Sequence, residues 1–136
     1  MEYLLRELVR AVMSGAPETE IEEAVQRNFE PVAENLRKRA PEYLADHPDL
    51  VERLNHVLLN GIRYMRQRGD FAHSTWILDA DPAKPPGWDT RLHIKSDEVW
   101  WVGEKAFESL ANQLGVTSVK LMELTNEIIE RREGST

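Results

Sequence analysis

The sequence has no cysteine, which excludes disulfides, thiolate chemistry and cysteine-type zinc sites. No apolar run approaches the roughly 18 residues needed to span a bilayer, so we expect no membrane segment. Residues 1–7 also lack the basic-then-apolar order of a signal peptide, which favours a cytoplasmic protein. Positive charge is scarce: 17 Lys and Arg against 24 Asp and Glu give a net charge of −7, the wrong sign for bulk attraction to nucleic acid.

The remaining composition is that of an ordinary globular protein. The 136 residues fit one domain spanning 1–136 with a core of its own, and 41% are apolar while 30% are charged. The basic residues are bunched, in Arg37-Lys38-Arg39 and again in Arg63, Arg66 and Arg68. Each cluster is either a local positive groove or a solvated helix face balanced by nearby glutamates, and the sequence leaves both interpretations open.

Apolar spacing predicts a mainly α protein, a helical bundle. Leu4, Leu5, Leu8, Val9 and Val12 indicate a helix over residues 2–14. A capping-box pair, Thr19 and Glu22, predicts a second helix over residues 19–40, in which Pro31 either kinks the helix or opens a new segment. A wide apolar stripe predicts the strongest helix over residues 48–69, which Gly69 weakens or ends.

The character of the sequence changes after His73. Residues 74–102 contain β-prone pieces around Trp76, Leu92 and Trp100, separated by a segment rich in Pro and Asp, which predicts a short β-hairpin or meander insertion. A C-terminal helical pair should follow, over residues 104–114 and 117–132, with Gly115 at the break.

The most informative stretch is residues 66–76, where arginines precede an Ala-His pair. Arginine matches the geometry of a phosphate, and histidine transfers protons near neutral pH. Arg68 and His73 are five residues apart and would point about 140° away from each other on an unbroken helix, so they converge only if the helix breaks at Gly69. Arg66 and His73 are seven apart and share a face without a break, so either arginine is a candidate partner.

This stretch resembles the signature of the HEPN superfamily, small helical domains of prokaryotic defence and nucleic-acid processing, in which an Arg precedes a His by four to six residues. Arg68 and His73 enclose four residues here, Arg66 and His73 enclose six, and Trp76 stands where many relatives have an aromatic. Gly69 departs from the polar residue common after the Arg, and Asp70 is its candidate substitute. The resemblance implies a metal-independent ribonuclease with His73 and Arg68 or Arg66 as catalytic residues, and Arg63, Asp70 and Trp76 as RNA contacts.

The implied reaction needs a base for the 2′-hydroxyl, an acid for the leaving 5′-oxygen and a cation for the phosphorane. One histidine does not easily serve both faces of the phosphate, and in the resembled family two protomers supply one each, so we expect a homodimer. The histidines have no metal-ligand spacing, and no cofactor motif is present.

Two alternatives remain open at this point. The chain is either a non-catalytic HEPN-like module that binds a partner protein, or a helix-turn-helix DNA-binding regulator formed by residues 107–124. In the second, Gly115 would take the left-handed turn and Ala111 the helix contact. Glu123, Glu127 and Glu130 would lie against phosphates and repel them, which argues against DNA readout.

Overall fold

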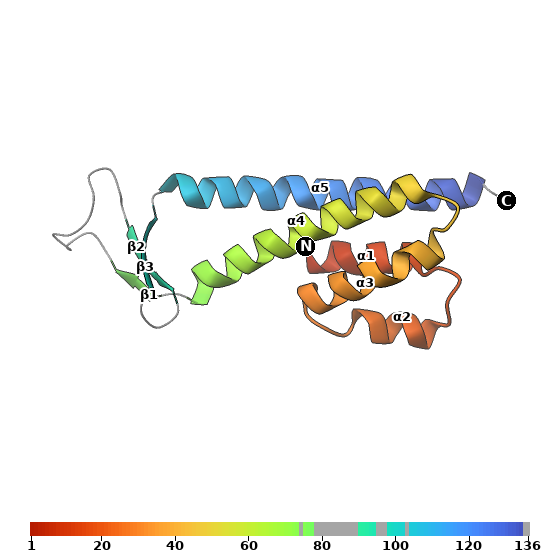
Figure 1. The fold of residues 1–136 in the computed structure, drawn as a ribbon, viewed down its shortest axis with the longest axis horizontal. Helices are drawn as coiled ribbons and strands as arrows, with labels where there is room; N and C mark the ends of the chain where they lie inside the picture. The colour runs from red at the N-terminus through yellow and green to blue at the C-terminus, as the bar shows by residue number, and fades with distance from the viewer. Residues whose placement is uncertain (74, 78–89, 95–97, 103, 135–136) are drawn as a thin grey trace. The chain divides into compact units, whose positions relative to one another are not determined.

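The computed structural model describes the backbone of residues 1–73, 75–77, 90–94, 98–102 and 104–134, and the side chains of residues 1–71 and 105–134. The elements, in chain order, are α1 (Glu2–Val12), α2 (Glu18–Val25), α3 (Phe29–Tyr43), α4 (Pro48–His73), β1 (Thr75–Ile77), β2 (Thr90–Ile94), β3 (Glu98–Val102) and α5 (Glu104–Gly134) (Figure 1). The prediction of a mainly helical bundle is confirmed. The described chain divides into a first unit, residues 1–63 with 115–136, and a second unit, residues 64–114.

The first unit is a helical bundle with an aliphatic core. α1, α3, α4 and α5 each bury residues at three- and four-residue spacing, so that one stripe of the helix faces the core, whereas α2 contributes Ile21 alone. Gly61 of α4 allows close packing, because a Cβ at this position would lie 2.9 Å from Cζ of the buried Phe29 ring. The largest fully buried side chains are Leu5, Leu8, Met13, Leu36, Leu44, Leu50, Leu54, Leu58, Leu121, Leu124 and Ile128.

Two predicted helix boundaries in the N-terminal half are wrong. The first helix ends at Val12, and the helix predicted over residues 19–40 is two helices separated at residues 26–28. Pro31 lies in the first turn of α3, where an amide has no intrahelical acceptor to lose. Pro41 lies inside the last turn of α3, so it removes one hydrogen bond near a helix end instead of breaking the helix.

Neither Gly69 nor Gly115 ends a helix. α4 continues through Gly69 to His73, four residues past the predicted end, and α5 is one helix where a pair meeting at Gly115 was predicted. A glycine costs about 1 kcal/mol in a helix interior. In α5, burial of Leu110, Thr117 and Leu121 at spacings of seven and four residues continues one packed stripe across Gly115. The helix-turn-helix prediction is therefore wrong.

The second unit contains the end of α4, the strands and the first part of α5. The strands form an antiparallel sheet in the order β1-β2-β3, with Trp76 opposite Leu92 and Leu92 opposite Trp100. β1, β2 and β3 fall within residues 74–102, the range for which the sequence predicts a β insertion; residues 78–89, which include the loop that the sequence predicts, lie outside the described residues. Phe71 at the end of α4 contacts Phe107 of α5 with ring centroids 5.0 Å apart.

Candidate functional site at the end of α4

The unbroken course of α4 decides which arginine shares a helix face with His73. Positions 66 and 73 are about 20° apart around the axis of an α-helix, whereas positions 68 and 73 are about 140° apart. Asp70 lies about 40° from Arg66, on the same face. The backbone thus groups Arg66, Asp70 and His73, and it separates Arg68 from them.

The contact made by Phe71 orients this face within the second unit. Phe71 is half-buried and stacks at a tilt of 41° on Phe107, so its side of α4 is directed toward the start of α5. Position 71 is about 140° from position 66 and about 160° from position 73. The face with Arg66 and His73 is therefore turned away from the aromatic contact, and Arg66 and Asp70 are both exposed.

Within the described residues, the structure does not group the remaining candidates from the sequence, Arg68, Arg63 and Trp76, with Arg66 and His73. Arg68 is exposed but lies about 60° from Phe71 around the helix. Arg63 is exposed and belongs to the first unit. Trp76 lies in β1, paired with Leu92, and its side chain, like that of His73, is outside the described residues.

The basic cluster of residues 37–39 divides between two environments. Arg37 is half-buried and donates to both carboxylate oxygens of Glu34 at 3.2 and 3.1 Å, one turn earlier in α3. Lys38 and Arg39 instead line a hollow between α2 and α3, together with Arg27. Sequence reasoning missed Arg27 because the predicted helix over residues 19–40 has no break at residues 26–28. The break between α2 and α3 is what places Arg27 at the hollow.

Comparisons with models of known protein families, with characterised proteins and with solved structures found no match to this chain. Within the described residues, no group of three metal-ligating side chains occurs. Across the same part of the chain, no helix is long and apolar enough to cross a bilayer.

Proposed function

We propose that the chain is a HEPN-like domain that cleaves RNA without a metal ion, with Arg66 binding the scissile phosphate and His73 transferring protons. The observation that supports this assignment is the continuity of α4 from Arg66 to His73, which keeps both positions on one face. The exposure of Arg66 makes its guanidinium accessible to a polyanion.

The chemistry of this pair follows from its residue types. A neutral imidazole removes the proton of the 2′-hydroxyl, whose oxygen attacks the phosphorus; the 5′-oxygen then leaves with a proton from an acid. The products are a 2′,3′-cyclic phosphate and a 5′-hydroxyl end. Arg66 stabilises the charge that builds on the phosphorane oxygens, because a guanidinium matches their geometry.

A second copy of the chain would supply the second imidazole. The surface that suits such pairing is the α5 apolar face, which we define as Val116, Val119, Met122 and Ile129; their exposed fractions are 50%, 52%, 49% and 40%. Around the helix these four positions span about 140°, and Val119 lies almost opposite the buried stripe of Leu121, Leu124 and Ile128. Exposed apolar side chains that gather on one element mark interaction surfaces.

The test is cleavage of single-stranded RNA in the presence of EDTA. His73→Ala and Arg66→Ala should each lower the rate by about a hundredfold or more, since each removes a group needed in the transition state. Arg68→Ala is the matched control: it removes the same charge from the same helix but from another face, and should keep most of the activity. All three variants should melt within a few degrees of the wild type. Equal losses in Arg66→Ala and Arg68→Ala would contradict the face assignment, and activity surviving in His73→Ala would contradict the mechanism.

A second candidate function is that of a non-catalytic interaction module, and the α5 apolar face favours it. If the wild-type chain cleaves no RNA, the same face should still bind a protein. In that case a specific partner should be retained by the wild type and lost with Val119→Glu. Retention by both chains would contradict this candidate.

A further inference from the structure

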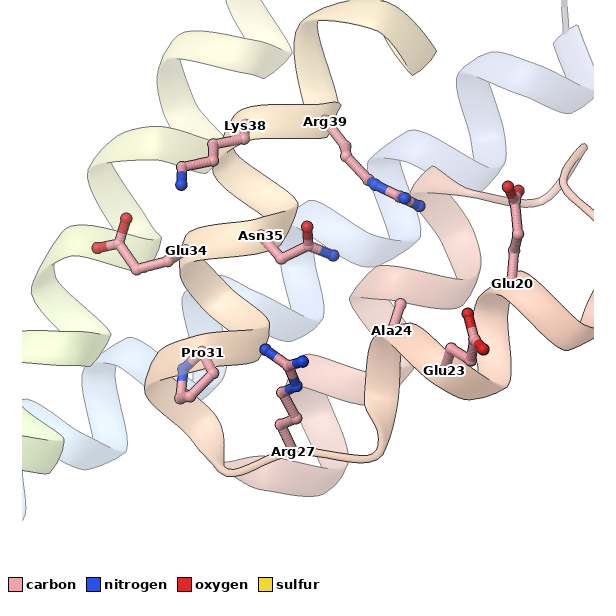
Figure 2. A pocket seen from close by; sticks show the side chains of 9 residues that line it. All are labelled: Glu20, Glu23, Ala24, Arg27, Pro31, Glu34, Asn35, Lys38 and Arg39. Atoms are coloured by element: carbon pink, nitrogen blue, oxygen red, sulfur yellow. The ribbon is translucent and has the colours of Figure 1, made fainter.

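A hollow of about 470 Å³ lies between α2 and α3 of the first unit, and no part of the proposed ribonuclease mechanism uses it. Ala24 of α2 and Pro31 of α3 are among its lining residues, and the others are polar. Figure 2 shows Arg39 extending from α3 toward α2, and Arg27 extending from the connection between the helices into the space between them. The volume of the hollow is in the range of small-molecule sites.

One side of the hollow presents hydrogen-bond donors. Within the part of the chain that the structure describes, the guanidiniums of Arg27 and Arg39 and the amide of Asn35 line the hollow and form no hydrogen bond or ion pair with another described side chain. Arginines nearby do pair: Arg10 contacts Glu18 at 3.0 Å, and Arg37 contacts Glu34. Two guanidiniums and an amide directed at one small space match an anion with several oxygens, such as a phosphate group.

The other side of the hollow is acidic. Glu20 and Glu23 line it from α2, one turn apart, and Figure 2 shows them across from Arg39. A free anion would meet both attraction and repulsion here. A ligand with an anionic group at one end and hydroxyl or amino donors at the other end satisfies both sides, because carboxylates accept hydrogen bonds from such donors.

We propose that this hollow binds a small phosphate monoester whose other end carries hydroxyl or amino groups, as in a nucleoside or sugar phosphate. Arg27, Arg39 and Asn35 hold the phosphate, and Glu20 and Glu23 accept hydrogen bonds from the donor end. This site goes beyond the proposed cleavage of RNA and does not depend on it.

In the first experiment the full chain is titrated with adenosine 5′-monophosphate. Binding is measured by calorimetry and by the shifts of backbone amide signals in NMR spectra. Arg27→Gln and Arg39→Gln should each weaken binding by about tenfold, the loss expected for one charge-assisted contact. Arg6→Gln is the matched control, because Arg6 is exposed on α1 and does not line the hollow. It should bind as the wild type does. Unfolding of each variant is monitored separately, so that a folded variant with unchanged affinity overturns the proposal.

The acidic side gives a second test with opposite signs for two probes. Glu20→Gln with Glu23→Gln should strengthen binding of inorganic phosphate, because two repelling charges are gone, and should weaken binding of adenosine 5′-monophosphate. A change in the same direction for both probes overturns the assignment of the donor end. Adenosine binding as tightly as its phosphate overturns the phosphate site. A competition experiment separates a small ligand from a polymer. If single-stranded RNA displaces bound adenosine 5′-monophosphate at a lower concentration than unlabelled adenosine 5′-monophosphate does, the ligand is a polymer and the proposal is overturned.

Discussion

Arg132 joins three segments of the first unit through one guanidinium. Its Nη1 donates to the carbonyl of Ala11 and to Oγ of Ser14, and its Nη2 donates to the carbonyls of Val12 and Tyr43. The acceptors are at the ends of α1 and α3, where carbonyls have no partner within the helix. Partial burial lowers the pKa of Arg132, but the group stays charged at any ordinary pH.

Replacing Arg132 by alanine should therefore destabilise the bundle by about 2 kcal/mol, since several carbonyls lose a charged donor. Urea unfolding followed by circular dichroism measures this loss. Arg131→Ala is the neighbouring control, because Arg131 contacts carboxylates at the surface instead of helix-end carbonyls. It should cost clearly less. Equal losses would show that the carbonyl contacts of Arg132 contribute nothing of their own.

Gly61 is needed for space, not for backbone freedom. Alanine there improves helix propensity by about 1 kcal/mol, but its Cβ would overlap the buried ring of Phe29, so we expect a net loss of about 1–2 kcal/mol. In a Phe29→Leu background the same substitution should be neutral or stabilising. A double-mutant cycle measures the coupling, and additive effects would contradict the steric explanation.

At the scale of the element, α4 and α5 show what the sequence could and could not predict. The apolar stripe from Leu50 to Ile62 predicts a helix because it is long and regular, and that prediction is confirmed. The ends were wrong because a glycine signals a break only when packing does not continue beyond it. In α5 the buried Thr117 and Leu121 continue the stripe. Pairing of the strands, the hollow beside Arg27 and the exposure of the α5 apolar face depend on contacts between distant segments, which local patterns do not contain.

Gly69 and Gly115 should tolerate alanine, because both lie inside helices with nothing within 4 Å of the added Cβ. Each substitution should raise the free energy of unfolding by about 0.5–1 kcal/mol. Thermal and urea unfolding measure it. Gly69→Ala should also leave any ribonuclease activity intact, since the proposed partner of His73 is Arg66. If Gly115→Ala lowered the free energy of unfolding, residue 115 would adopt the left-handed turn of a helix-turn-helix, and the continuous course of α5 would be contradicted.

Ion pairs between the start of α4 and the end of α5 should make stability depend on acid pH. The hydrogen bond from Arg131 lowers the pKa of Asp49, and those from Arg53 and then Arg131 lower the pKa of Glu127. In both carboxyls the pKa is lower in the folded state than in the unfolded state. The stabilisation that the ion pairs give is therefore complete above the unfolded-state pKa, and it is lost as the pH falls through the folded-state pKa. The loss of stability should begin below about pH 4.5.

Melting temperatures from pH 7 to pH 3 measure this effect. Glu127→Gln should melt below the wild type at pH 7, and this difference in melting temperature should narrow as the pH falls toward 3, because the carboxyl of the unfolded wild-type chain takes up a proton more readily than that of the folded chain. Glu123→Gln is the control, an exposed carboxylate on α5 without these partners. A gap for Glu127→Gln that does not change with pH would contradict the electrostatic explanation.

For the whole molecule, the net charge of −7 opposes the binding of RNA, which is a polyanion and the substrate of the proposed reaction. A phosphate chain approaches an acidic protein only where cations are grouped. Pairing two copies would double the number of Arg66 and His73 residues available to one RNA, while each copy alone brings one His73 to two proton transfers. The oligomeric state is therefore the property of the whole molecule on which the proposed mechanism most depends.

We expect the wild-type chain to sediment as a dimer at about 100 μM, and the double variant Val119→Glu with Met122→Glu to sediment as a monomer, because it places charges in the α5 apolar face. The variant should keep the helical circular dichroism signal, since both side chains are about half exposed. Tyr3→Glu, at an apolar position 69% exposed on α1, controls for the loss of exposed apolar surface and should remain dimeric. If the monomeric variant cleaves RNA as fast as the wild type, one histidine suffices, and the pairing of two chains is not part of the chemistry.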